Sequence, residues 1–188
     1  LSEKVYAITS YGAKTTASAA QNQKAINRAI SLASKKGGKV VIPAGTWNTG
    51  AIELKSGVNL VIEEGATLRF AFEPKLYPLV RTSWEGLACW NYSPCIYAYQ
   101  AKDIAITGKG TIDGGGNNDT WWQWNGNPRF GFKAGVTTES QKLGSRSKLL
   151  KQAEDGVAFD ERKFGMGQGL RPQLINFYHC NTVLIEDV

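Results

Sequence analysis

Three tryptophans in one glycine- and asparagine-rich stretch are the first candidates for chemistry: Trp121, Trp122 and Trp124. An indole ring presents a flat apolar face that can stack against the C–H groups of a sugar ring, while its N–H group finds a polar partner. Each tryptophan is therefore a candidate for binding a saccharide. The alternative, in which these rings pin a long loop onto the rest of the protein, fits the sequence as well.

Charged side chains near this stretch could bind an acidic ligand. A guanidinium group holds a carboxylate through two parallel hydrogen bonds, and Arg171 is the strongest candidate because a long irregular segment returns there to a strand-like run. Glu85, within Trp84-Glu85-Gly86, could accept hydrogen bonds from sugar hydroxyls or tie its own loop. Other basic candidates, of types that are more often simply solvated, are Arg129, Lys133, Arg146 and Lys148.

No catalytic residue is assigned from the sequence. The acidic pairs Glu154-Asp155 and Asp160-Glu161 stand in a charged stretch of the kind that is usually solvated. His179, the one histidine, lies in a strand-like run, which favours a packed or surface side chain. Asn118-Asp119-Thr120 is a glycosylation sequon, which matters only in a glycosylating host.

We expect neither a metal site nor a cofactor. Cys89 and Cys95 could close a small disulfide loop in an oxidising compartment, which would leave Cys180 single. Buried thiols that act as small apolar side chains are the favoured alternative. The cysteines do not have metal-ligand spacing, and a single histidine cannot complete a zinc site.

The net charge points to a polyanionic partner. The chain has 188 residues, 42% of them hydrophobic, with a formal net charge of +6. Its lysines and arginines are scattered and match no nucleic-acid-binding motif, so we expect no nucleic-acid partner. An acidic polysaccharide would be attracted equally well, and a merely solvated basic surface explains the charge as readily as either. No apolar run approaches the roughly 20 residues that span a bilayer, and we expect no membrane partner.

A repeated phrase indicates how these residues are positioned. It recurs at residues 59–68 (NLVIEEGATL), 103–112 (DIAITGKGTI) and 182–188 (TVLIEDV), with Ile62, Ile106 and Ile185 at equivalent places. Such recurrence predicts a solenoid, in which each coil buries its apolar face only against the next coil. From residue 39 the apolar residues alternate in short strand-like runs. A sandwich made from a meander of hairpins is the competing architecture.

One helix is expected before the strands. Ser18 and Gln21 have the spacing of a capping box, and an apolar stripe follows them, so we predict a helix over about residues 18–36 that covers the first edge of the solenoid. We expect one domain over residues 1–188, with coils from about residue 39 and insertions at about 69–93 and 114–170. The chain begins with Leu1 rather than Met and stops within a strand-like run, so we expect it to be part of a longer, exported protein.

An ordered set of phrases resembles glycoside hydrolase family 28, the polygalacturonases and related pectin hydrolases. In chain order the matching phrases are YGA (11–13), GKVVIPAGT (38–46), TGAIELKS (49–56), EGATL (64–68), WEG (84–86), ITGKGTIDG (106–114), WW (121–122) and RP (171–172). The resemblance implies a right-handed parallel β-helix with an N-terminal capping helix. It also implies secreted or periplasmic hydrolysis of galacturonosyl linkages with inversion, which would make a galacturonate-containing polysaccharide the substrate.

Inverting hydrolysis needs two carboxyl groups roughly 6.5–9.5 Å apart, one as acid and one as base. The family's motifs for this work, Asn-x-Asp, Asp-Asp, Gly-His-Gly and Arg-x-Lys, lie on coils that follow the part matched here. None is present in register, so we expect the catalytic acids downstream and this segment alone to be inactive. Two alternatives remain: a non-catalytic carbohydrate-binding β-helix module, and a pectate lyase with Ca²⁺ held by several carboxylates.

Overall fold

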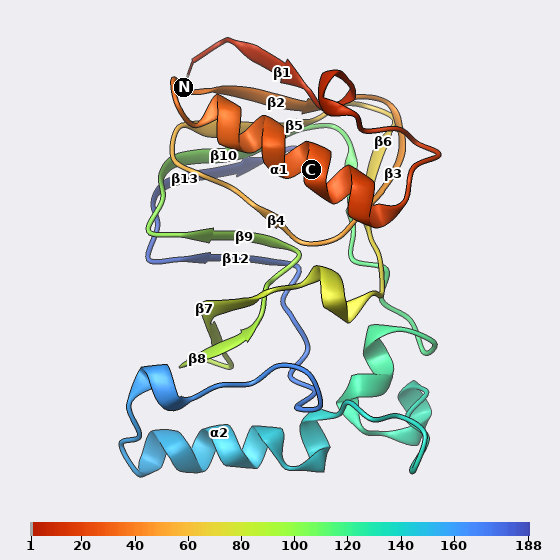
Figure 1. The fold of residues 1–188 in the computed structure, drawn as a ribbon, viewed down its shortest axis with the longest axis vertical. Helices are drawn as coiled ribbons and strands as arrows, with labels where there is room; N and C mark the ends of the chain where they lie inside the picture. The colour runs from red at the N-terminus through yellow and green to blue at the C-terminus, as the bar shows by residue number, and fades with distance from the viewer. Residues whose placement is uncertain (1) are drawn as a thin grey trace. The chain divides into compact units, whose positions relative to one another are not determined.

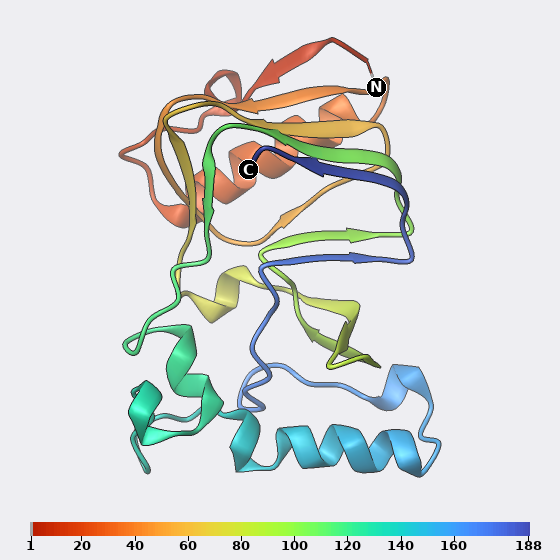
Figure 2. The same cartoon turned by 180° about the vertical axis from the view of Figure 1, so that it is seen from behind.

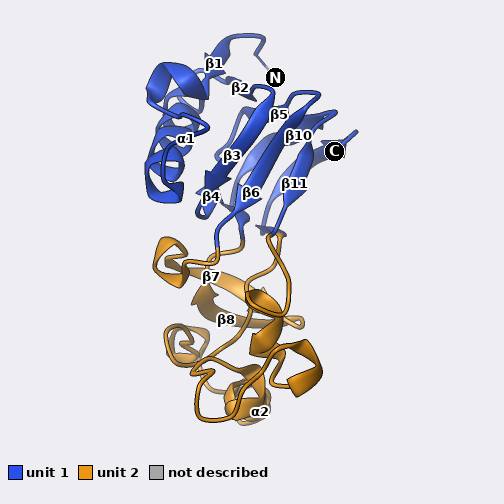
Figure 3. Ribbon diagram, turned by 90° about the vertical axis from the view of Figure 1, so that its right-hand side faces the viewer, with its two compact units in different colours: residues 1–71, 95–114, 175–188 blue, residues 72–94, 115–174 orange. Residues whose placement is uncertain are grey.

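The computed structural model describes residues 2–188, and the chain divides into two compact units (Figure 3). Unit 1 contains residues 1–71, 95–114 and 175–188, and unit 2 contains residues 72–94 and 115–174. Unit 1 consists mostly of parallel strands, whereas unit 2 contains a hairpin, a helix and several short 3-10 turns.

Unit 1 is built from three parallel sheets (Figure 1). The first sheet contains, in spatial order, β1 (Val5–Ala7), β2 (Gly38–Ile42), β5 (Val58–Ile62), β10 (Lys102–Gly108) and β13 (Asn181–Glu186). The second sheet contains β3 (Gly45–Thr49), β6 (Ala66–Phe70) and β11 (Thr111–Asp113). The third sheet contains β4 (Ile52–Glu53), β9 (Ile96–Tyr99) and β12 (Ile175–Tyr178).

The chain visits these sheets in one repeating order, and we call one strand from each sheet a pass. The first pass is β2, β3 and β4, the second is β5, β6 and β9, the third is β10, β11 and β12, and β13 begins a fourth. Each strand pairs in parallel with its counterpart in the next pass, as the ribbon shows from behind (Figure 2). A meander of antiparallel hairpins is therefore wrong for unit 1.

Both segments of unit 2 are connections from the second sheet to the third. Residues 72–94 follow β6 and precede β9, and residues 115–174 follow β11 and precede β12. Because β6 pairs with β11 and β9 pairs with β12, the two segments leave from neighbouring strands and return to neighbouring strands. This topology brings together two stretches that are far apart in the sequence.

The register differs from the one that the repeated phrase suggests. Ile106 pairs with Ile185, which holds the equivalent place in the phrase, but on its other side Ile106 faces Leu60, so Ile62 lies opposite Gly108 instead. Gly108 has a φ of +124°, and a Cβ there would stand 2.0 Å from the Ile62 carbonyl oxygen. The offset of two residues keeps the same side chains pointing inward, because side chains alternate with a period of two along a strand.

Helix α1 (Ala19–Ala33) begins at the predicted capping box. The Ser18 hydroxyl accepts the Gln21 backbone N–H at 3.2 Å, and the Gln21 side chain accepts the Ser18 N–H at 3.2 Å. The helix ends three residues before the predicted Lys36. Lys35 and Lys36 donate their backbone N–H groups to the carbonyls three residues earlier, so the last turn is tightened out of α-helical geometry.

Helix α1 lies beside β3 and β4 (Figure 3), and side-chain amides attach it to this part of the first pass. The Asn22 amide donates to the Asn48 carbonyl at 2.9 Å, and the Gln23 amide donates to the Ala51 carbonyl at 2.8 Å. The Asn27 side chain accepts the Glu53 backbone N–H at 3.0 Å. Because β3 and β4 are edge strands, these amides satisfy backbone groups that no neighbouring strand reaches.

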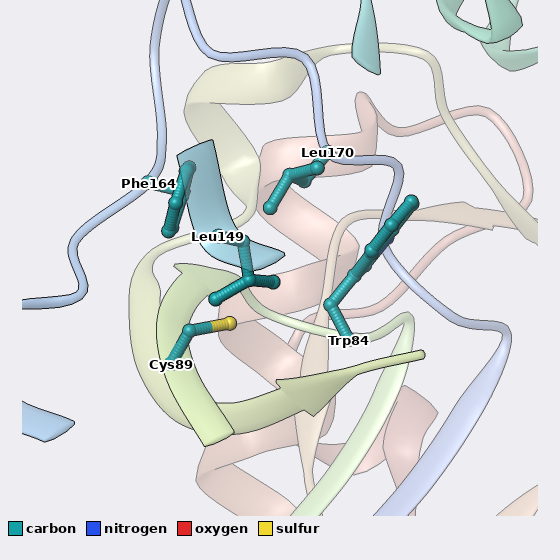
Figure 4. Packing of buried hydrophobic residues seen from close by; sticks show 5 residues of the cluster. All are labelled: Trp84, Cys89, Leu149, Phe164 and Leu170. Carbon is teal, nitrogen blue, oxygen red and sulfur yellow. The ribbon is translucent and has the colours of Figure 1, made fainter. Parts of the chain in front are cut away.

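Unit 2 is organised by an antiparallel hairpin and a helix. Strands β7 (Leu79–Trp84) and β8 (Leu87–Tyr92) are joined by Glu85 and Gly86, both at positive φ, and α2 covers Ser145–Glu154. Figure 4 shows the core between them, where the side chains of Trp84, Cys89, Leu149, Phe164 and Leu170 are turned toward one another.

All three cysteines are free thiols, so the disulfide alternative for Cys89 and Cys95 is not realised in this structure. Cys89 and Cys95 are buried, in agreement with the expectation of apolar thiols. Burial raises the pKa of Cys89 to about 11, which keeps it uncharged at neutral pH. Neither α1 nor α2, the two α-helices of residues 2–188, has the length and apolar character of a membrane-spanning helix.

Because neighbouring passes approach closely at Gly108, we expect substitution by alanine to destabilise the protein more there than at Gly12. We expect Gly108→Ala to lower the free energy of unfolding by more than about 2 kcal/mol, because the new Cβ would overlap the Ile62 carbonyl and the φ angle would be strained. Gly12→Ala is the control: its φ is +101° with nothing within 4 Å of the new Cβ, and we expect a cost of about 1 kcal/mol. Urea titration measures both costs, and equal costs would contradict the close packing of neighbouring passes.

Candidate functional site

Trp121 and Trp124 lie in an aromatic cluster of unit 2 and not on a free surface. Their exposed fractions are 7% and 2%. Trp121 makes edge-to-face contacts with Phe72 at 4.8 Å and Tyr77 at 5.0 Å between ring centroids, and Trp124 lies 5.2 Å from Trp121. These rings hold residues 115–174 against residues 72–94. The structure therefore assigns Trp121 and Trp124 a packing role, and neither has an exposed face for a sugar.

Trp122, between these two residues in the sequence, is 45% exposed. It belongs to the 3-10 turn Trp121–Asn125, in which consecutive side chains point in different directions. The indole lies close to Gly116, where a Cβ would stand 2.7 Å from the indole nitrogen. Glycine at this position lets the ring rest on the backbone, so Trp122 is exposed and at the same time held in place.

A cavity of about 220 Å³ connects Trp122 with Arg171. Asn125 and Phe130 complete its lining. Residues three apart eclipse one another in a 3-10 turn, which places Asn125 beside Trp122. Trp122 and Arg171 were predicted from the sequence, whereas Asn125 and Phe130 were not. The three-residue spacing is a signal for Asn125, whereas nothing local to Phe130 indicates its position.

Arg171 supplies the charge of this cavity. Its guanidinium group is half-buried, and among residues 2–188 no carboxylate forms an ion pair with it. Burial lowers the pKa of Arg171, but a guanidinium still remains charged at neutral pH. A partly desolvated cation without a counter-ion attracts an anion strongly, and a carboxylate matches its geometry.

The backbone of Arg171 is fixed from the hairpin. The Trp84 indole N–H donates to the Arg171 carbonyl at 3.1 Å, and the Asn91 amide donates to the Leu170 carbonyl at 3.0 Å. Leu170 is fully buried in the core of unit 2. The segment that carries the guanidinium is therefore held in two ways, by the packing of Leu170 and by hydrogen bonds to its backbone carbonyls.

The other charged residues that were candidates for ligand binding lie outside this cavity. Glu85 forms an ion pair with Arg146 at 2.9 Å, so these two candidates bind each other at the tip of the hairpin. Lys148 lies over the Phe164 ring at 5.3 Å, and Arg129 lies over the Phe130 ring at 5.8 Å. Lys133 is exposed. None of these five lines the cavity of Trp122 and Arg171.

Asp160 and Asp155 of unit 2 are engaged in ion pairs. Asp160 accepts the Trp90 indole N–H and pairs with Arg81 at 2.5 Å; these contacts, the Trp90 bond first, lower the pKa of Asp160. A general acid needs a raised pKa instead. Asp155 pairs with Lys151. Within residues 2–188 no three His, Cys, Asp or Glu side chains are grouped closely enough to hold a metal ion.

His179 lies in unit 1, after the last residue of β12. It has a φ of +55°, and its ring lies 4.4 Å from the Tyr178 ring and 6.2 Å from the Tyr99 ring. The side chain is exposed at the turn that leads back to the first sheet. Of the two alternatives expected for this residue, a packed or a surface side chain, the structure has the surface one.

Comparisons with known proteins give one consistent result. No protein-family model matches the chain. It is 35% identical over 124 residues to an exo-poly-alpha-D-galacturonosidase from Dickeya chrysanthemi, which covers 60% of this chain and 20% of that protein. The crystal structure of a hyperthermoactive exopolygalacturonase from Thermotoga maritima superimposes with a TM-score of 0.93 at 36% identity, covering 100% of this chain and 41% of that one.

A family 28 exopolygalacturonase from Yersinia enterocolitica has a TM-score of 0.64 at 22% identity, covering 99% of this chain and 34% of that one, which shows a shared fold. The chain spans about a fifth of the length of the curated relatives that it matches. The chain thus corresponds to a segment of these proteins.

Substitution of two tryptophans in one 3-10 turn should destabilise the protein to very different extents. We expect Trp124→Ala to lower the free energy of unfolding by about 3–5 kcal/mol, because it leaves a hole in the aromatic cluster. We expect Trp122→Ala to cost less than about 1 kcal/mol, because that ring is largely exposed. Chemical denaturation of the two variants measures the difference. A large loss from Trp122→Ala would show that this ring packs and is not free to bind.

Proposed function

Because the chain is homologous to a segment of the family 28 polygalacturonases, we propose that it forms part of a glycoside hydrolase that cleaves galacturonosyl linkages of pectin-type polysaccharide with inversion. The observation in the structure that carries this proposal is the half-buried, unpaired Arg171 beside the exposed Trp122. A galacturonate unit has both of the features that these residues recognise. Its carboxylate fits the guanidinium, and its pyranose face fits the indole.

We take unit 1 as a right-handed parallel β-helix in which each pass is one coil and α1 caps the first coil. The repeated visits to three parallel sheets support this interpretation, as do the amide contacts of α1 with the edge strands. In this view residues 72–94 and 115–174 are insertions into one domain, placed where the second sheet leads to the third.

The binding site lies in unit 2. The net charge of +6 attracts a polyanion over a distance, and Arg171 then pairs with one of its carboxylates. Trp122 stacks on the sugar ring, and Asn125 lies within reach of its hydroxyl groups in the same cavity. Because polymeric pectin is too large to enter a cell, we propose that the enzyme works outside the cytoplasm, as a secreted or periplasmic protein.

The chemistry itself needs two further carboxyl groups. Several acids of the described residues are already paired: Asp113 with Arg69, Glu85 with Arg146, and Asp160 with Arg81. We therefore propose that the acid and the base of the reaction come from residues outside this chain, so that the 188 residues bind galacturonan without cleaving it.

A non-catalytic carbohydrate-binding module is the second candidate, because the same cavity would serve it equally well. A reducing-end assay separates activity from binding. We expect no release of reducing ends from polygalacturonate by the 188-residue chain alone, and release by a longer protein that contains it. A longer protein that binds galacturonan without cleaving it favours the binding module, and turnover by this chain alone would contradict our assignment of the acids.

We predict that Arg171→Gln weakens the binding of trigalacturonate about tenfold, since it removes a charge-assisted pair from a partly buried site. Lys133→Gln removes the same charge from an exposed position and is the matched control, for which we expect less than a twofold change. Isothermal titration calorimetry measures both. The neutral trisaccharide of galactose should bind weakly and be insensitive to Arg171→Gln. Equal effects of the two substitutions would count against a specific carboxylate contact.

A further inference from the structure

Glu139 holds the segment that leads to Arg171. Its Oε1 accepts the Tyr92 hydroxyl at 3.1 Å and the Gly167 backbone N–H, and its Oε2 accepts the Gly169 backbone N–H at 2.6 Å. Burial, and then the adjacent negative charge of Glu139, raise the pKa of Tyr92, so its hydroxyl stays protonated and donates. Both oxygens of the carboxylate are thus used by uncharged donors.

The held backbone is packed too closely for any residue except glycine at one position. Gly169 has a φ of +65°, and a Cβ there would stand 2.0 Å from the backbone nitrogen of Ser140, the residue after Glu139. Gly167 also has a positive φ, +81°. The chain around Glu139 and the chain before Arg171 are therefore pressed together, with the carboxylate bridging them.

Arg171 lies two residues after Gly169, the last residue that Glu139 binds. Beyond Gly169 the chain continues with Leu170, which is buried and bonded to Asn91, and with the Arg171 carbonyl, which is bonded to Trp84. The hairpin contacts fix one side of this short segment. Glu139 supplies the contacts at the other side, two residues before the guanidinium-bearing position.

The charges of Glu139 and Arg171 stay separate. No ion pair joins them among residues 2–188, although both lie in unit 2. A carboxylate that binds backbone N–H groups orders a loop without neutralising the cation which that loop carries. We propose that Glu139 is a positioning residue, which sets the backbone before Arg171 so that the guanidinium is presented, unpaired, to a uronate carboxylate. This inference rests on the proposed function of the Arg171 site.

The first test needs no ligand. In the 188-residue chain we expect Glu139→Gln to speed the hydrogen exchange of the Gly167 and Gly169 amides about tenfold and to shift the Arg171 Nε–H resonance in the ¹⁵N spectrum. Glu154→Gln removes the same charge from an exposed site on α2 and is the control, for which we expect no change at Arg171. An unchanged Arg171 Nε–H resonance in a folded Glu139→Gln chain would overturn the proposal.

A double-mutant cycle then tests whether Glu139 acts through Arg171. We expect Glu139→Gln to weaken trigalacturonate binding about fivefold in the native background. In the Arg171→Gln background it should have less than a twofold effect, because the positioned group is gone. Additive losses would overturn the proposal, since Glu139 would then act on binding by another route.

The two tests also separate this inference from the proposed function. If the native chain does not bind trigalacturonate, the proposed function fails, while the Arg171 resonance still decides whether Glu139 positions that side chain. If Glu139→Gln does not fold, the milder Tyr92→Phe removes one of the three donors to the same carboxylate. A shift of the Arg171 resonance in Tyr92→Phe supports the proposal, and its absence contradicts it.

Discussion

Parallel hydrogen bonding between successive passes is the constraint on which the rest of this structure depends. It makes β6 and β11 neighbours, and likewise β9 and β12, so both connections between these strands start side by side and finish side by side. Two segments separated in the sequence can then share one core, which contains the hairpin of β7 and β8 together with α2. The cavity of Trp122 and Arg171 is a consequence of that shared core.

Folding of this core places the charged guanidinium of Arg171 in a partly buried position, which is unfavourable by itself. Partial burial of Arg171 without a counter-ion removes water from a cation, which costs free energy unless another group replaces that water. The hydrogen bonds from Trp84, Asn91 and Glu139 end on the backbone of its segment. They order the segment but leave the charge available. A ligand carboxylate would supply the missing partner, and binding would recover that cost.

Local signals predicted local structure well. The capping box of Ser18 and Gln21 gave the start of α1, and the alternation of apolar residues predicted short strands whose parallel pairing the structure confirms. The phrase did not indicate the two-residue offset between Ile62 and Ile106, because the close approach at Gly108 depends on the neighbouring pass and not on the phrase itself. For the same reason, the sequence could not distinguish the buried tryptophans from the exposed one. Which ring is buried depends on Phe72 and Tyr77, which come from another part of the chain.

We propose a galacturonate carboxylate as the missing partner of Arg171. A crystal structure of this chain with bound trigalacturonate tests it most directly. We predict one sugar unit in the cavity, with its carboxylate on the Arg171 guanidinium and its ring against Trp122. A ligand bound elsewhere on the chain while this cavity stays free of sugar would contradict it.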